Sequence, residues 1–201
     1  MRVLIGCEFS GIVRDAFIRQ GFDAISCDLL PSESDFGPHI QGDILGILAD
    51  GWKAAVFFPP CTFLCNSGVR WLYKGGKQAN GKDWDRWIDM EEGAKFFDAL
   101  LNAPIPHVAV ENPVQHGYAG LPEFTQSVQP WQFGHGEVKR TCLWLRNLPE
   151  LRSTNIVNGR HPRVHRESPG ADRWRKRSIT YPGIAEAMAL QWGNYLKGEG
   201  I

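Results

Sequence analysis

The fold is decided by residues 3–28, which read VLIGCEFSGIVRDAFIRQGFDAISCD. The stretch opens on an apolar run typical of a buried strand and continues into a glycine-containing turn. Residues 12–20 then carry apolar side chains at helical spacing, with Ser10 placed to cap this helix and Gly21 to end it. A second apolar run closes on Asp28. This order, a strand, a glycine turn, a helix, a second strand and an acid, predicts the first half of a nucleotide-binding βαβ unit.

The alternation of strands and helices continues to the end of the chain. Further strands are predicted at 54–58, 107–110, near 131–133 and at 142–145, and further helices over 84–101 and 184–196. This order predicts an α/β fold with a mostly parallel sheet and helices on both faces. With 201 residues, we expect residues 1–201 to form a single domain that carries long polar loops at 61–82 and 149–178.

The composition excludes several classes of protein. Hydrophobic residues make up 43% of the chain and charged residues 22%, a balance that excludes a disordered or collagen-like protein. The longest apolar run, at 54–58, is far shorter than the roughly 18 residues that cross a bilayer. The N-terminus lacks the pattern of a signal peptide. The five cysteines form no CxxC pair, which argues against a disulfide framework and a zinc site. We therefore expect a cytoplasmic protein that holds no metal.

The charge is balanced overall but unevenly distributed. The chain has 22 Lys+Arg and 22 Asp+Glu, yet residues 160–177 hold six Arg and one Lys against two acids. His161, His165 and Trp174 are interleaved with these cations, a composition that suits contact with phosphates. A solvated charged loop is the alternative. The candidate nucleic-acid contacts in this segment are Arg163, Arg166, Arg173, Arg175 and Arg177.

Several chemically active residues follow predicted strands. In an open parallel sheet the ligand lies beyond the carboxyl ends of the strands. The residues at those ends are Phe9-Ser10-Gly11, Asp28, Asp43, Pro59-Pro60-Cys61 and Glu111-Asn112. Two prolines stiffen the backbone before Cys61, so its thiolate could be aimed at an electron-poor carbon. The alternative for this cysteine is a small apolar core residue. Cys65, four residues later, is interpreted as incidental.

These motifs, in this order along residues 3–146, resemble those of the DNA cytosine-5 methyltransferases. The four that carry the resemblance are Phe9-Ser10-Gly11, Gly42-Asp43-Ile44, Phe58-Pro59-Pro60-Cys61 and Val110-Glu111-Asn112-Pro113. Later segments resemble the small phage-type branch of that family, namely residues 131–134 (WQFG), 139–145 (KRTCLWL) and 181–188 (YPGIAEAM). The resemblance implies the Rossmann-like fold of S-adenosylmethionine-dependent methyltransferases. It also implies a phage origin, a role in evading restriction and a location in the bacterial host cytoplasm.

The resemblance implies a mechanism that the chemistry justifies. Cytosine C5 is too weak a nucleophile to take a methyl group directly, whereas addition of the Cys61 sulfur to C6 makes C5 an enamine carbon. Glu111 would hold or protonate N3, and Arg140 would contact the base or its phosphate. The implied residues for S-adenosylmethionine are Phe9, Ser10, Gly11, Asp28, Asp43, Pro59 and Pro60. Asp28 would meet the ribose and Asp43 the adenine amino group, with a helix cap or solvated turn as the alternative for each acid.

The implied substrate is a cytosine flipped out of duplex DNA. Asn66, Ser67, Arg70 and Lys139 are further candidate contacts to nucleic acid, although a purely loop-forming role for the first three is equally open. The chain departs from the larger family members by having Lys139-Arg140-Thr141 where they carry Gln-Arg-x-Arg, and only 149–178 where they carry a target-recognition domain. Two alternatives stay open: the same chemistry on a free cytidine nucleotide, and a catalytically silent protein that binds nucleic acid.

Overall fold

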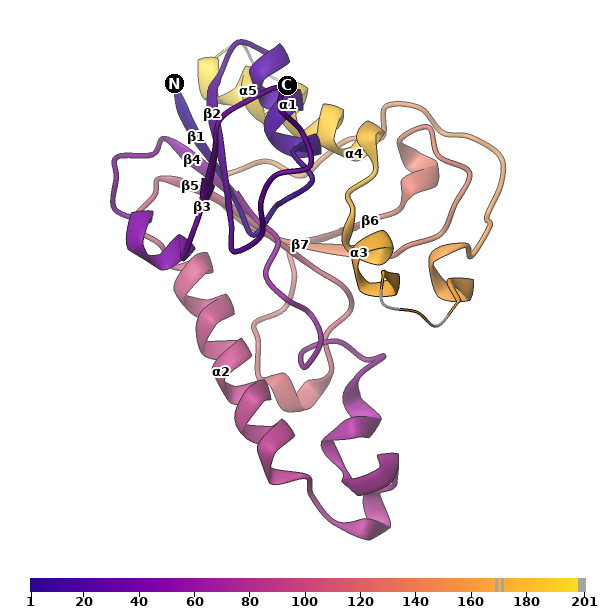
Figure 1. The fold of residues 1–201 in the computed structure, drawn as a ribbon. Coiled ribbons are helices and arrows are strands. Elements are labelled where there is room, and N and C mark those ends of the chain that lie inside the picture. The colour runs from indigo at the N-terminus through magenta and orange to yellow at the C-terminus, as the bar shows by residue number, and fades with distance from the viewer. Residues whose placement is uncertain (169, 171, 199–201) are drawn as a thin grey trace.

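Seven strands form a single sheet in the order β3-β2-β1-β4-β5-β7-β6 (Figure 1). The computed structural model describes residues 1–168, 170 and 172–198. The strands are β1 (Arg2–Gly6), β2 (Asp23–Asp28), β3 (His39–Gln41), β4 (Ala54–Phe57), β5 (His107–Asn112), β6 (Gln126–Val128) and β7 (Thr141–Arg146).

The central strands are parallel and level at their carboxyl ends. Strand β1 pairs in parallel with β2 and β4, and β3 and β5 extend the sheet in the same direction. Gly6 lies opposite Phe57, which in turn lies opposite Val110, so the residues after β1, β4 and β5 emerge side by side. Strand β7 runs antiparallel between β5 and β6, so its first residues lie at this same edge.

Helices cover both faces of the sheet. On one face α1 (Ile12–Arg19) packs against the C-terminal helices, with Phe17 and Trp192 in a shared core. On the other face α2 (Trp84–Leu101) packs through Phe97 against Trp144. The remaining helices are α3 (Arg173–Ser178), α4 (Pro182–Ala187), α5 (Gly193–Lys197), the π-helix η8 (Met188–Trp192), and the short helices η1 (Ile44–Ile47), η2 (Val69–Leu72), η3 (Lys74–Gly76), η4 (Gln78–Asn80), η5 (Gly117–Ala119), η6 (Pro130–Gln132) and η7 (Val164–Arg166). The expected α/β class, a Rossmann-like and mostly parallel sheet with helices on both faces, is therefore confirmed.

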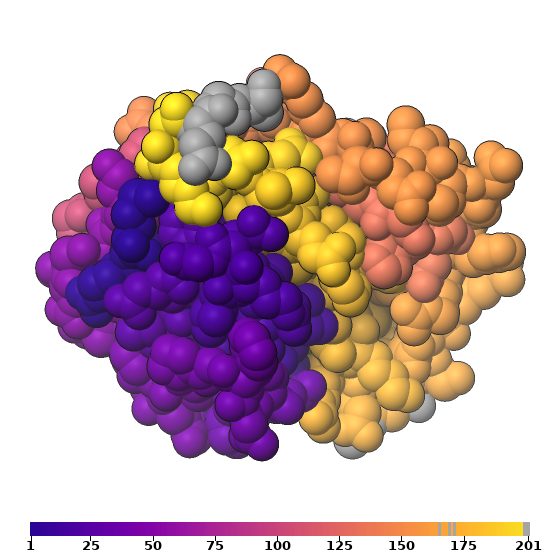
Figure 2. Space-filling model, turned by 90° about the horizontal axis from the view of Figure 1, so that it is seen from above, coloured from indigo at the N-terminus to yellow at the C-terminus, as the bar shows by residue number. Residues whose placement is uncertain are grey.

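The start of β1 and helix α5 lie on the same side of the molecule (Figure 1). In the view from above, the C-terminal helices lie between the N-terminal segment and the loops that follow β7 (Figure 2). The final helical stretch begins at Pro182, close to the expected start, and includes the π segment before α5. None of the helices in the described ranges is long and apolar enough to cross a membrane.

Two details of the sequence prediction are wrong. The expected strand near 131–133 is the short helix η6, because Pro130 starts it and Gln129 and Gln132 form a reciprocal cap. The neighbouring strand is β6, which precedes η6 in the chain and is too polar to stand out. The N-cap of α1 is Gly11 rather than Ser10, although Ser10 Oγ still accepts a hydrogen bond from the Ile12 backbone N–H (3.3 Å).

Gly11 offers a test of how the first turn is built. Its φ is +77°, and a Cβ there would lie 2.6 Å from the Arg14 guanidinium and 2.7 Å from Ser34 Cβ. Gly21 has a similar φ of +80° but open space around it. We expect Gly21→Ala to lower the free energy of unfolding by about 1 kcal/mol, from backbone strain alone. Gly11→Ala should cost about 2 kcal/mol or more, because overpacking adds to that strain. Urea denaturation of both variants measures the difference, and equal losses would contradict it.

Candidate active site

One large cavity opens at the carboxyl edge of the sheet. Its volume is about 880 Å³, within the range of small-molecule sites. Its wall combines the ends of β1, β2, β4 and β5 with the start of β7, the segment after Cys61 and helix α3. Many of the residues singled out from the sequence line it, namely Phe9, Ser10, Asp28, Pro59, Pro60, Cys61, Asn66, Ser67, Glu111, Lys139, Arg140 and Arg177.

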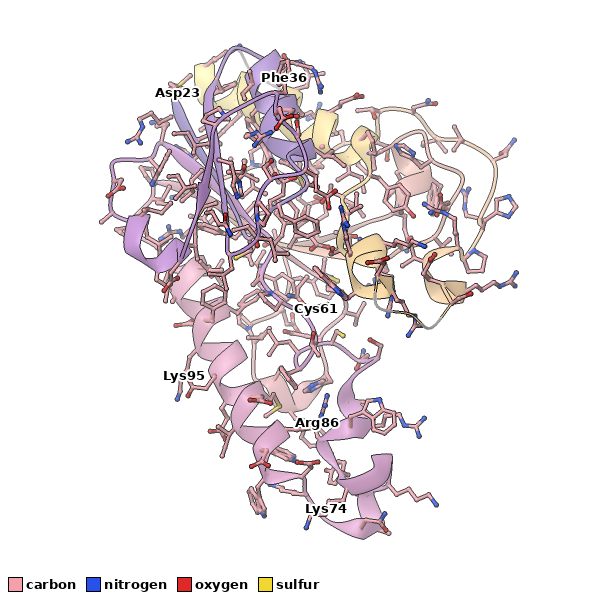
Figure 3. The ribbon with its side chains drawn as sticks, in the orientation of Figure 1. Asp23, Phe36, Cys61, Lys74, Arg86 and Lys95 are labelled. Atoms are coloured by element: carbon pink, nitrogen blue, oxygen red, sulfur yellow. The ribbon has the colours of Figure 1, made fainter. Side chains whose placement is uncertain are left out.

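Cys61 sits where strand β4 gives way to the first turn of the following loop. The strand stops at two prolines, and the Cys61 carbonyl accepts the backbone N–H groups of Leu64 and Cys65 (both 3.1 Å). The buried Asn112 side chain donates a hydrogen bond to the Pro59 carbonyl (3.3 Å), which ties this loop to β5. Cys61 itself is partly exposed and lines the cavity; Figure 3 labels it below the sheet.

Glu111 and Lys139 line the cavity together with Cys61. Burial raises the pKa of Glu111 above its usual value, while Lys139 and a hydrogen bond with Thr141 oppose that shift. The charge of Glu111 also raises the pKa of the Cys61 thiol, and that of Lys139 lowers it. A raised pKa favours the protonated form of the Glu111 carboxyl, which is the form that can donate a proton to a ring nitrogen.

The part of the cavity lined by Cys61, Glu111 and Lys139 is here called its first half, and the part lined by Phe9, Asp28 and Glu8 its second half. The second half combines aromatic and acidic side chains. The Phe9 ring lies 5.8 Å from the ring of Trp174, which α3 brings over it. Asp28 lines this half, and burial raises its pKa. The neighbouring Glu8 is buried, its pKa is raised by burial, and its Oε2 atom has no hydrogen-bond partner within the part of the chain that the structure describes. A buried carboxylate oxygen without a partner is costly unless a ligand donates to it.

The loop of residues 29–38, which continues the cavity wall after Asp28, is held in place by the buried guanidinium of Arg14. Arg14 is fully buried and pairs with Asp15 (2.7 Å). It also donates to Ser26 Oγ (3.0 Å) and to the Ser34 carbonyl (3.0 Å), which ties residues 29–38 to α1 and β2. This loop in turn supplies Glu33, whose carboxylate pairs with an arginine of α3.

Two candidate cofactor residues lie away from the cavity lining. Asp43 is exposed and its Oδ1 accepts the Leu45 backbone N–H (3.0 Å), so it caps η1, the alternative expected for an acid there. Gly11 faces Arg14 and Ser34, so its lack of a side chain serves the turn itself. Both residues flank the cavity wall without contributing to it.

The basic segment 160–177 is largely engaged within the protein. Arg163 pairs with Glu137 (2.9 Å) and Arg175 with Glu33. Arg173 Nε donates to the Glu167 carbonyl (2.9 Å). Of the five arginines proposed as nucleic-acid contacts, Arg177 alone lines the cavity, and its Nε is buried with no partner among the described residues. Arg163, Arg166, Arg173 and Arg175 lie outside its lining, and the Arg175–Glu33 pair ties α3 to the loop of residues 29–38.

Sequence reasoning missed several cavity residues. Glu8 lies in the cavity wall after β1, and Arg86 enters from α2 with its guanidinium over the Phe63 ring (5.0 Å). Trp174, noted from the sequence among the cations of 160–177, reaches the cavity on α3. Lys139 rather than Arg140 influences both Cys61 and Glu111, since the exposed Arg140 guanidinium lies over Phe124 (5.5 Å). The described residues contain no group of three or more metal-ligating side chains.

The sequence matches no known family model and no curated protein. Solved structures similar to this chain include the following three. A protein described as a DNA modification methyltransferase encoded within an E. coli prophage has 13% identity and a TM-score of 0.49, over 84% of this chain and 55% of that one. The Entamoeba histolytica methyltransferase EhMeth has 14% identity and a TM-score of 0.49, over 78% and 57%. A mutant of Spodoptera frugiperda DNMT2 has 13% identity and a TM-score of 0.40, over 78% and 54%. The chain spans about half the length of these structures.

Glu111 provides a pH test of the site. Because burial raises its pKa in the folded state, ionisation of Glu111 destabilises the fold as pH rises through the interval between its ordinary and its raised pKa. Glu111→Gln removes that penalty. We expect this variant to unfold at a higher urea concentration than the wild type at pH 7 and at the same concentration near pH 4. The exposed Glu123→Gln variant should follow the wild type at both pH values. A urea midpoint of Glu111→Gln no higher than that of the wild type at pH 7 would contradict a raised pKa of Glu111 in the folded protein.

Proposed function

We propose that this chain is an S-adenosylmethionine-dependent methyltransferase that modifies C5 of cytosine in DNA. The observation that carries the proposal is that one cavity holds Cys61, Glu111 and Lys139 in one half and Phe9, Asp28 and Glu8 in the other. A nucleophile with an acid in one half suits addition to a pyrimidine ring, and the aromatic, acidic half suits a cationic nucleoside cofactor.

The second half of the cavity has groups that match each part of the cofactor. Phe9 and Trp174 offer aromatic faces for the adenine, and Asp28 an acceptor for ribose hydroxyls. The Glu8 Oε2 atom, with no partner among the described residues, would accept hydrogen bonds from the methionine ammonium group. When bound, S-adenosylmethionine supplies an electrophilic methyl group on a sulfonium centre.

The reaction assigns a separate task to each residue of the first half. The Cys61 sulfur forms a bond to C6, and electron density moves to C5, which can then take the methyl group. Glu111 donates a proton or hydrogen bond to N3, and Lys139 offsets the charge that gathers beside it. Loss of the C5 proton to water restores the ring double bond, breaks the C6–S bond and releases the Cys61 thiolate.

The covalent step has a direct test. We expect Cys61→Ala to reduce transfer of labelled methyl to a cytosine-containing duplex at least about 1,000-fold, the scale seen when a nucleophile is removed. Its affinity for S-adenosylmethionine, measured by calorimetry, should not change. In 5-fluorocytosine DNA the C5 proton is absent, so the wild type should accumulate a protein–DNA adduct that mass spectrometry detects. Methyl transfer by Cys61→Ala at the wild-type rate would overturn the covalent mechanism.

A projecting arm favours a polymeric substrate. Residues 66–90, here called the arm, comprise η2, η3, η4 and the start of α2 and extend away from the sheet beside Cys61 (Figures 1 and 3). Residues 66–82 contain four cations, Arg70, Lys74, Lys77 and Lys82, and no acid. Within the described ranges, no ion pair involves these cations. This contrasts with the engaged cations of 160–177.

Exposed aromatic rings accompany the cations of the arm. Trp71 lines the cavity and is 46% exposed, with the Arg70 guanidinium over its ring (4.8 Å). Trp84 is 63% exposed and lies beneath Lys82 (5.0 Å). Cations that meet phosphates and aromatic faces that stack on bases are the two contacts that hold an unpaired strand. The arm would thereby support a strand that continues beyond the reacting base.

Salt dependence distinguishes DNA from a free nucleotide. We expect the double variant Arg70→Ala/Lys77→Ala to bind DNA more weakly and to lower the slope of log K against log salt by about 1 for each phosphate that these side chains neutralise. Lys95→Ala, which removes an exposed lysine paired with Glu92 on the far part of α2, is the matched control and should leave the slope unchanged. Efficient, salt-insensitive methylation of free cytidylate by both proteins would favour the nucleotide alternative. DNA binding without transfer to either substrate would favour the silent binding protein.

A further inference from the structure

Arg86 reaches the cavity from the first turn of α2, beside the segment that follows Cys61. Its guanidinium lies over the ring of Phe63 (5.0 Å), two residues after Cys61, and Figure 3 labels Arg86 below Cys61. The other cations of the arm are absent from the cavity lining, namely Arg70, Lys74, Lys77 and Lys82. The arm therefore contributes one cation, Arg86, to the wall that also holds Cys61.

The guanidinium of Arg86 has no partner in the part of the chain that the structure describes. Its Nε is buried and makes no hydrogen bond there, and none of the ion pairs involves this side chain. Arg14, by contrast, pairs with Asp15 (2.7 Å) and donates to Ser26 Oγ (3.0 Å). Arg177 has a buried Nε like that of Arg86, but it lies on α3, at the second half of the cavity. A buried guanidinium donor without an acceptor is costly unless a ligand supplies one.

The charge of Arg86 is not explained by the stability of α2. The first turn of a helix favours acids, because the helix dipole is positive there, and Asp83 and Asp85 follow this rule. Arg86 lies in the same turn and does not follow it. Its packing on Phe63 is equally open to an uncharged side chain such as methionine, which also makes favourable contacts with aromatic rings. We therefore expect the charge to serve the binding of an anion.

We propose that Arg86 binds the phosphate of the nucleotide whose base reacts with Cys61. A guanidinium binds phosphate oxygens through two parallel hydrogen bonds, and the phosphate of a nucleotide is only one sugar away from its base. A base in the first half of the cavity therefore brings its phosphate to the wall where Arg86 lies. Arg86 makes this site specific for a nucleotide over a nucleoside or a free base. The identity of the base rests on the proposed function, but the recognition of phosphate does not.

The binding of small nucleotides tests Arg86 without any methyl transfer. Calorimetry measures the affinities of deoxycytidine and of its 5′-monophosphate for the wild type, Arg86→Met and Arg86→Lys. We expect the wild type to bind the monophosphate at least about tenfold more tightly than the nucleoside, the scale of a hydrogen bond to a charged group. Arg86→Met should bind both compounds about equally. Arg86→Lys should keep only part of the preference, because an ammonium group cannot form two parallel hydrogen bonds.

Arg19→Met is the matched control. The Arg19 guanidinium also lies over a phenylalanine ring, that of Phe36 (5.2 Å), but Arg19 is outside the cavity lining, so its replacement should leave the phosphate preference unchanged. Urea denaturation checks for a structural role of Arg86. Since Arg86→Met removes a charge without a partner among the described residues and keeps the packing on Phe63, we expect its urea midpoint to be no lower than that of the wild type.

A dinucleotide distinguishes the two sources of the phosphate. In thymidylyl-(3′→5′)-deoxycytidine the phosphate is a diester, as in DNA, and its methylphosphonate analogue lacks the charge. A preference of the wild type for the diester over this analogue that is lost in Arg86→Met assigns the phosphate to a nucleic-acid strand. A preference that depends on Arg86 but is confined to the monophosphate assigns it to a free nucleotide. Both results support a phosphate site at Arg86.

The remaining outcomes separate this inference from the proposed function. An equal phosphate preference in the wild type and Arg86→Met would overturn the role of Arg86. So would a wild type that binds neither phosphate compound more tightly than its uncharged counterpart. Methyl transfer to cytosine by such a protein would leave the proposed function standing. Conversely, a phosphate preference that depends on Arg86 in a protein that methylates no cytosine substrate would sink the proposed function and leave the phosphate site standing.

Discussion

The hydrogen bond from the buried Asn112 side chain to the Pro59 carbonyl holds the two halves of the reactive edge at a fixed separation. Parallel strands alone make their carboxyl ends level, but they leave the loops that follow free to diverge. Here the prolines after β4 remove backbone N–H groups and leave carbonyls, and β5 supplies the amide that meets one of them. Strand β4 leads to Cys61, and strand β5 carries Glu111. The two strands are therefore joined by this side-chain hydrogen bond as well as by the backbone hydrogen bonds of the sheet.

The cations of the chain are divided between two structural tasks. Among the described residues of 160–177, Arg163, Arg175 and Lys176 pair with acids. The pairs of Arg175 with Glu33 and of Lys176 with Glu167 hold the short helix α3 over Phe9. The cations of residues 66–82 in the arm face solvent among exposed indole rings. Composition alone favours segment 160–177 as the nucleic-acid contact, because its cations are more closely spaced than those of the arm. The spacing of cations in the sequence does not tell whether their charges are already paired with acids.

The sequence was sufficient for the elements whose signal is local. Helix α2 begins and ends where its apolar spacing predicts, and the strands around Cys61 and Glu111 are apolar runs bounded by prolines or acids. Strand β6 and strand β3 escaped because three-residue segments show no periodicity and form strands through their neighbours. Glu8 escaped for another reason, because its importance lies in a buried oxygen atom with no partner among the described residues, which is apparent only in the folded chain. Lys139 was named from the sequence as a nucleic-acid contact, but its effect on the pKa of Glu111 depends on the fold.

The anchoring of residues 29–38 by Arg14 bears on how this molecule could be altered. The guanidinium contacts hydroxyl and carbonyl oxygens of the loop and does not depend on apolar side chains there. Main-chain carbonyls are present whatever residues occupy the loop, so most of its positions are open to replacement while its path is kept. The protein therefore has a wall whose lining can be redesigned, to accept bulkier donor molecules for example, provided that one internal arginine is left untouched.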